Sequence, residues 1–260
     1  ITSFNGNGLS SLTYLALDQN QLTSFSVTGL TALTNLYLQD NLLTSFDGTG
    51  LTSLNNLYLG NNQLTSFDGT GLTSLTNLSL INCGLSSLDG FILPSSLTNL
   101  DLSNNQLTSF DGTDLTSLTS LGLAGCSLSS LDGFILPSSL TQLYLFDNQL
   151  TSFDSTGLTS LTILGLDVNQ ITSFDGTGLT SLTTLYLRNN QLTSFNGTGL
   201  TSLTELYLNN NQLTSFDGTD LTSLTWLGLV NNQLTSLDVS PMVALYSLHL
   251  ADPYGLNGNP

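Results

Sequence analysis

Leucine recurs along the chain in a fixed pattern, Leu-x-x-Leu-x-Leu-x-x-Asn-x-Leu, with polar residues between. The interval is 21 residues, except for two intervals of 22. Self-similarity at this period predicts a solenoid in which each repeat is one coil. The first leucine of the pattern stands at Leu12, Leu33, Leu54, Leu75, Leu97, Leu118, Leu140, Leu161, Leu182, Leu203, Leu224 and Leu245. We therefore expect one solenoid over residues 1–260, with a partial repeat at 1–11, eleven repeats over 12–244, and a terminal strand and tail at 245–260.

The repeat Leu182–Ser202 shows what each position does. In a short strand alternate side chains point to opposite faces, so Leu185 and Leu187 point inward and Tyr186 outward. Stacked copies then form a parallel sheet on the concave side, with about 4.8 Å between strands. The following Asn190 turns inward and bonds to backbone groups, because buried polar groups must be satisfied. A 21-residue coil leaves room for 3₁₀ turns and extended segments on the convex side, but little α-helix.

The segment Asn232–Ser240, followed by Ala244 and Leu245, resembles bacterial and viral leucine-rich-repeat proteins with 21-residue repeats. The resemblance covers the whole chain. It implies an α/β-class leucine-rich-repeat solenoid, a right-handed superhelix. Members of this family bind proteins, glycans and cell surfaces through the side chains they display, so the family indicates a fold more than a function.

Variation between the copies is confined to one face. The turn sequence Thr-Ser-Phe-Asp-Gly-Thr-Gly barely changes, whereas the outward strand positions and the two residues after them differ from copy to copy. Free drift would vary the exposed turns as well, so the concave face is predicted to bind a ligand. Tyrosine, tryptophan and arginine dominate interface energetics, although stacked tyrosines also stabilise sheets. The predicted ligand-binding residues are Tyr14, Tyr37, Tyr58, Asp101, Tyr144, Phe146, Tyr186, Arg188, Glu205, Tyr207, Trp226 and His249, with the preferred centre at Tyr186, Tyr207, Arg188, Glu205 and Trp226.

The charge balance narrows the class of ligand. One basic residue, Arg188, stands against 18 acidic residues, for a net charge of −17. Nucleic acids and anionic membranes require Lys and Arg, so neither nucleic-acid binding nor membrane insertion is expected. Acidic, lysine-free surfaces suit salty or calcium-containing surroundings, which indicates an extracellular or surface-exposed protein: secreted, cell-surface or virion-borne.

No catalytic motif appears, and we expect no enzyme. His249 is the only histidine, so triads and zinc sites lack their components. Paired carboxylates, Asp18 with Asp40 or Asp147 with Asp167, are the remaining catalytic candidates.

Aspartates recur in the turns, in the series Asp47, Asp68, Asp89, Asp111, Asp132, Asp154, Asp175, Asp217 and Asp238. Stacked carboxylates would raise one another's pKa or recruit cations, which leaves calcium at Asp47, Asp68, Asp111, Asp154, Asp175 and Asp217 as a weak alternative to no cofactor. The favoured interpretation is that each carboxylate caps its own turn.

Two copies carry cysteine, Cys83 and Cys126, in place of the inward asparagine, and both are the 22-residue copies. Two coils separate them by roughly 10 Å, beyond disulfide reach, so buried free thiols are expected.

The predicted function is non-catalytic recognition or adhesion, with a glycan or cell-surface protein bound on the concave face. One alternative is a building block of an extracellular fibre or virion surface. A second is ice binding by the threonine rows, exemplified by Thr65 and Thr193, although a curved sheet fits a flat lattice poorly. Because residues 1–11 lack a polar cap, further chain or a partner is expected before Ile1.

Overall fold

The computed structural model describes residues 1–26 and 29–251. The chain forms two compact units. The first unit contains residues 1–126 and 133–139, and the second contains residues 127–132 and the chain from Leu140 onward. The predicted terminal strand lies among the described residues, whereas most of the predicted tail, residues 252–260, lies outside them.

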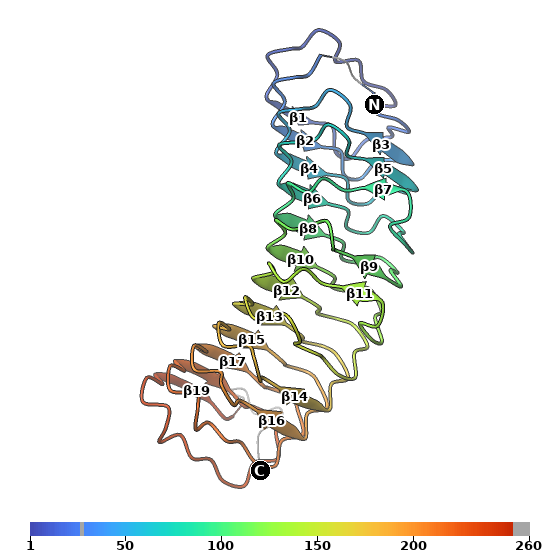
Figure 1. Ribbon diagram of the computed structural model, residues 1–260. Helices are drawn as coiled ribbons and strands as arrows, with labels where there is room; N and C mark the ends of the chain where they lie inside the picture. The colour runs from blue at the N-terminus through green and yellow to red at the C-terminus, as the bar shows by residue number, and fades with distance from the viewer. Residues whose placement is uncertain (27–28, 252–260) are drawn as a thin grey trace. The chain divides into compact units, whose positions relative to one another are not determined.

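Each unit is built on parallel three-residue strands, one per coil, which form its main sheet (Figure 1). The central leucine of each main-sheet strand is buried in the coil, as the alternation predicts, except Leu248 of the last strand, which is exposed. The strands of the first unit are β1 (Tyr14–Ala16), β2 (Asn35–Tyr37), β4 (Asn56–Tyr58), β6 (Asn77–Ser79), β8 (Asn99–Asp101) and β10 (Ser120–Gly122). Those of the second unit are β12 (Gln142–Tyr144), β13 (Ile163–Gly165), β15 (Thr184–Tyr186), β17 (Glu205–Tyr207), β18 (Trp226–Gly228) and β19 (Ser247–His249).

Further parallel strands, of two or three residues, lie on another side of the coils and form small sheets. In the first unit β3 (Ser45–Asp47), β5 (Ser66–Asp68) and β7 (Phe91–Ile92) form one small sheet, and β9 (Phe110–Asp111) and β11 (Phe134–Ile135) form another. In the second unit β14 (Ser173–Asp175) pairs with β16 (Ser194–Asn196). The expected extended segments are therefore partly ordered into sheets.

Tight turns connect the two kinds of strand. Leu51 N donates to Gly48 O, and Leu54 N donates to Leu51 O, both at 3.1 Å. These are isolated turns with the hydrogen-bond pattern expected of 3₁₀ structure, and no helix forms among the described residues. Nor do these residues contain a helix long and apolar enough to span a membrane.

The core consists of stacked leucines, together with one column of phenylalanines and one column of inward asparagines. On the side of the small sheets the phenylalanine rings stack, with Phe46 and Phe67 centred 5.6 Å apart. The inward asparagines form a second column, as predicted. Asn41 Nδ2 donates to Leu17 O at 2.9 Å and Leu38 O at 3.0 Å, while its Oδ1 accepts from Leu22 N at 2.9 Å. Each buried asparagine thus ties its coil to the preceding coil.

The two cysteines are buried and free, as expected, and stand in the same column. Cys83 Sγ lies 3.3 Å from Leu59 O, and Cys126 Sγ lies 3.4 Å from Leu102 O. Burial raises the pKa of the Cys83 thiol to about 11, so the thiolate that reacts with oxidants and metals is disfavoured.

Candidate ligand-binding face

The outer face of the main sheet carries the first and third side chains of each main-sheet strand, together with the side chain two residues after it. In the second unit six rings on this face lie side by side. This aromatic row consists of Tyr144, Phe146, Tyr186, Tyr207, Trp226 and His249.

The rings from Tyr186 to His249 pack in a stacked or tilted arrangement, whereas Phe146 meets Tyr186 edge to face. The ring centroids of Tyr186 and Tyr207 are 4.7 Å apart with planes 19° from parallel. Those of Tyr207 and Trp226 are 4.0 Å apart, and Trp226 and His249 stack at 5.0 Å. Tyr207 and Trp226 therefore have a ring on each side, and what they present to solvent is ring edges and polar tips.

Two glycines make room for the row. Gly165 and Gly228 occupy the third position of their strands, where every other main-sheet strand except β10, with Gly122, carries a side chain. A Cβ added to Gly165 would lie 2.2 Å from the Phe146 ring, and one added to Gly228 would lie 2.5 Å from the Trp226 ring. The rings of the preceding coil and of the same strand thus fill space that any other residue would occupy.

Arg188 is held in place by a carboxylate beside the row. Its Nη2 lies 2.7 Å from Asp167 Oδ2, and its Nε donates to the same oxygen at 2.7 Å. The backbone N of Arg188 donates to Asp167 Oδ1 at 2.6 Å. The guanidinium also lies over the rings of Tyr186 and Tyr207, at 5.6 and 5.1 Å from their centroids. Burial raises the pKa of Asp167, and the bonds from Arg188 only partly oppose that rise.

Glu205 fixes the polar end of Tyr207. The Tyr207 hydroxyl donates to Glu205 Oε2 at 3.0 Å. Burial, together with this bond to a carboxylate, raises the pKa of Tyr207 to about 12, so the phenol stays protonated. The predicted centre of the site is therefore brought together: Tyr186, Tyr207, Trp226, Arg188 and Glu205 contact one another in one cluster.

The outer face of the first unit has different chemistry. The ring centroids of Tyr14 and Tyr37 are 5.2 Å apart, and those of Tyr37 and Tyr58 are 4.8 Å apart. Beyond them the face is formed by amides, with Asn56 Nδ2 donating to Asn35 Oδ1 at 2.7 Å. This unit contains no Lys, Arg or His.

Asp101 is separated from these tyrosines, because β6 lies between its strand β8 and β4. Its Oδ1 accepts from the Ser103 hydroxyl at 2.6 Å and from the Ser103 backbone N at 3.0 Å. The predicted residues thus fall into one large cluster, one tyrosine stack and one isolated carboxylate.

In each candidate catalytic pair one carboxylate is already bonded to another residue. Asp167 is paired with Arg188, and Asp40 Oδ1 accepts from Asn61 Nδ2 at 2.8 Å. Among the described residues no three histidine, cysteine or acidic side chains converge as metal ligands would.

The turn aspartates cap their own turns. Thr49 N donates to Asp47 Oδ1 at 2.8 Å, and the same contact recurs at Asp68, Asp111, Asp154, Asp175 and Asp217. Hydrogen bonds from the threonine hydroxyl and amide lower the pKa of the carboxyls of Asp47, Asp111, Asp154, Asp175 and Asp217. The expectation that stacked carboxylates raise one another's pKa is wrong, because each charge is stabilised locally.

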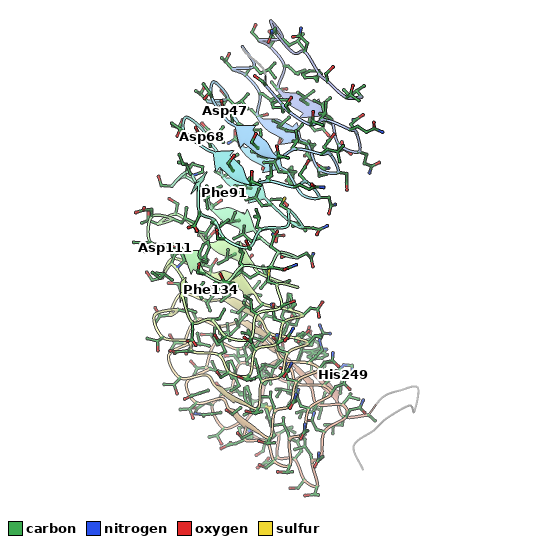
Figure 2. The ribbon with its side chains drawn as sticks, turned by 90° about the vertical axis from the view of Figure 1, so that its right-hand side faces the viewer. Asp47, Asp68, Phe91, Asp111, Phe134 and His249 are labelled. Carbon is green, nitrogen blue, oxygen red and sulfur yellow. The ribbon has the colours of Figure 1, made fainter. Side chains whose placement is uncertain are left out.

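The predicted register of the turn aspartates is also wrong in the two 22-residue copies. Asp68 pairs with Ile92, and Asp111 pairs with Ile135. The longer copies shift Asp89 and Asp132 out of the series. Figure 2 shows Asp47, Asp68, Phe91, Asp111 and Phe134 following one another along the small sheets of the first unit.

Two hydroxyls of the threonine rows donate to backbone carbonyls of the preceding coil. The hydroxyl of Thr65 donates to Thr44 O at 3.2 Å, and that of Thr193 donates to Thr172 O at 3.4 Å. These two hydroxyls join consecutive coils, which gives Thr65 and Thr193 a structural role.

Sequence reasoning missed three components of the cluster. It treated Asp167 as a catalytic candidate and did not see it as the partner of Arg188, and it gave no role to Gly165 and Gly228. Glycine in the third strand position, next to an aromatic residue of the preceding coil or the same strand, is the signal that could have revealed the seats for Phe146 and Trp226.

These features define a parallel β-solenoid with a variable, aromatic outer face. A family model described as leucine-rich repeats (two copies) matches residues 31–73, 95–136 and 180–221. The chain has the leucine-rich-repeat fold, with 21-residue repeats, and is similar to bacterial proteins of this kind. This fold is typical of non-catalytic protein-binding modules.

Solved structures from two bacteria resemble the chain. The functional domain of InlJ from Listeria monocytogenes, reported to include a cysteine ladder, is 29% identical, with a TM-score of 0.72 over 94% of this chain and 54% of that chain. A leucine-rich-repeat protein of Leptospira interrogans is 27% identical, with a TM-score of 0.69 over 94% and 80% of the two chains. The internalin InlF of Listeria monocytogenes is 25% identical, with a TM-score of 0.62 over 94% and 88%. The chain thus spans about half of the InlJ structure. No curated protein matches it by sequence.

Proposed function

We propose that the chain is a recognition module that binds a protein ligand, one displayed on a cell surface, through the outer face of its main sheet. The observation that carries the proposal is the cluster of Tyr186, Tyr207, Trp226, Arg188 and Glu205. Aromatic residues and arginine supply most of the energy of protein interfaces. Rings held by their neighbours lose little further freedom on binding, so less of the interaction energy is spent on ordering them.

The geometry of the row favours a protein ligand over a glycan. A sugar that stacks on an aromatic side chain needs a free ring face, and the faces of Tyr207 and Trp226 are covered by neighbouring rings. Edges and polar tips instead suit the mixed apolar and polar surface of a protein. An anionic protein with one arginine also attracts basic partners and repels nucleic acids. We therefore expect a ligand with a basic surface, met outside the cell or at its surface.

The test is a paired screen of the purified chain against an array of secreted and cell-surface proteins and against a glycan array. The informative variant is Tyr207→Ala/Trp226→Ala. The comparison variant is Tyr37→Ala/Tyr58→Ala, which removes a stacked pair of rings on the first unit with no arginine or tryptophan beside it. We expect selective binding to a protein, weakened about 30-fold or more by the first variant, since central interface residues contribute about 2 kcal/mol or more.

Because the first unit has no arginine or tryptophan on this face, the Tyr37→Ala/Tyr58→Ala variant should lose at least several-fold less affinity than the first variant. Binding confined to glycans would overturn the choice of ligand. Equal losses in the two variants would show that stacked tyrosines act only by stabilising the sheet.

A further inference from the structure

A pocket of about 280 Å³ lies in the first unit, at the break between its two small sheets. Strand β7 pairs with β5 and strand β9 with β11, but β7 and β9 do not pair with each other. The break follows the first 22-residue copy, in which Ile92 and not Asp89 pairs with Asp68. The pocket lies apart from the main sheet that carries the candidate ligand-binding face.

The lining combines an apolar floor with an acidic rim. Leu93, Phe110 and Leu115 belong to the floor, and Phe110 and Leu115 are buried in the coil. The rim carries the carboxylates of Asp89, Asp111 and Asp114, all on exposed residues. Asp89 is on the rim because the longer copy displaces it from the series of turn aspartates.

The rim carboxylates have no positive charge near them within the chain. The first unit has no Lys, Arg or His, and the carboxylates of Asp89 and Asp114 have no hydrogen-bond or ionic partner among the described residues. Asp111 is the exception, since it accepts hydrogen bonds from Thr113. The three acidic groups do not converge closely enough to hold a metal ion.

We propose that this pocket is a second docking site, one that takes a single basic side chain, arginine or lysine, from a partner protein. The alkyl stem of such a side chain would lie on the floor, and its cationic head would lie between the rim carboxylates. Long basic side chains bury their stems against apolar surface while the charge stays at the rim. The volume is below that of usual small-molecule sites, which suits one side chain.

The second unit contains a comparison pocket of about 290 Å³ at the equivalent turn. Both pockets are lined by residues of an Asp-Gly-Thr-Asp segment, at 111–114 and 217–220. Most other copies carry glycine in place of the second aspartate. In the second pocket Asp220 Oδ2 already accepts from Gly199 N at 2.9 Å, and Phe195 is the one large apolar side chain of its lining. It lacks both the aliphatic floor and the free carboxylate, so it should bind a basic side chain more weakly.

The experiment titrates n-butylguanidinium, an analogue of the arginine side chain, into the ¹⁵N-labelled full chain and follows backbone amide shifts. We expect saturable shifts at residues 88–93 and 109–115, and weaker binding at residues 195–198 and 217–220. Asp89→Asn/Asp114→Gly should raise the dissociation constant at the first pocket about fivefold or more. Glycine at position 114 is what most copies carry, which keeps the turn foldable.

Three controls decide the outcome. Asp154→Asn removes an exposed turn carboxylate outside the pocket and should leave the dissociation constant unchanged. Guanidinium without the alkyl chain tests the floor, and n-butanol tests the rim; each should bind at least several-fold more weakly than the complete probe. The proposal is overturned if shifts spread evenly over all the turn aspartates, or if the double variant binds as tightly as the original chain.

Discussion

Each coil turns sharply at the residue before the inward asparagine or cysteine, and the backbone of that residue has a positive φ in the left-handed region. The φ angles at this position lie between 52° and 59°, and reach 64° at Gly125, which precedes Cys126. Asparagine and aspartate tolerate the left-handed region better than other side chains, and most copies carry one of them there. Val168 is the exception with a β-branched side chain, at φ 57°. Its backbone is strained without compensation from packing, because the side chain is 45% exposed.

Val168→Asn should therefore stabilise the second unit by about 1 kcal/mol, at the lower end of the cost of such a conformation. The new amide would also extend an existing row, in which Asn210 Nδ2 donates to Asn189 Oδ1 at 2.8 Å. Urea denaturation followed by circular dichroism measures the change. The reverse substitution, Asn210→Val, should destabilise by a similar amount or more. A Val168→Asn protein no more stable than the original would contradict this account of the turn.

At the scale of strands and turns, the repeat spacing predicted most of the fold. The spacing alone indicates a strand in each coil, its inward leucines and the bonding of the asparagine column. It did not predict where the small sheets break, because Asp89 follows Asp68 at the ordinary interval of 21 residues, whereas the structure pairs Asp68 with Ile92. Nor did it predict the partner of Arg188. Variation identifies which face is displayed, but the distance between Asp167 and Arg188 depends on how adjacent strands align their side chains.

The turn element makes a prediction about acid stability. Bonds from Thr156 lower the pKa of Asp154, so the folded state binds that proton less tightly than the unfolded chain does. The stability from this turn is present above the unfolded pKa and is lost as pH falls through the lowered folded pKa. Thr156→Val removes the hydroxyl bond of 2.7 Å and keeps the backbone bond.

We therefore expect Thr156→Val to lower the melting temperature at pH 7 and to have a smaller effect at pH 2.5. Comparing the two proteins at each pH cancels the general effect of net charge. The matched control is Thr151→Val, at an exposed threonine three residues before Asp154. Its effect should not change with pH. A Thr156→Val effect that is constant between pH 7 and pH 2.5 would rule out the carboxylate as its cause.

At the scale of the whole molecule, the net charge is −17 and the described residues contain one ion pair. Charge repulsion therefore lowers the free energy of unfolding. Like charges repel in the compact chain, and salt screens that repulsion, with a Debye length of about 30 Å at 0.01 M and about 10 Å at 0.1 M. The melting temperature should therefore rise between 10 and 300 mM NaCl, at fixed pH. A protein held together by surface ion pairs would show the opposite trend.

Calcium tests whether the turn aspartates form a specific cation site, which sodium chloride does not test. A specific calcium site in the folded chain would add stability according to the ratio of calcium concentration to its dissociation constant, beyond any screening. The turn aspartates already accept bonds from their own threonines, which compete with a cation for the same oxygens. We therefore expect CaCl₂ and MgCl₂, at equal concentration and equal ionic strength, to raise the melting temperature equally. Magnesium screens charge as calcium does, but it does not accept the same irregular oxygen geometry. A larger rise with calcium, abolished by Asp154→Asn and Asp175→Asn together, would therefore show that consecutive turns bind the ion jointly.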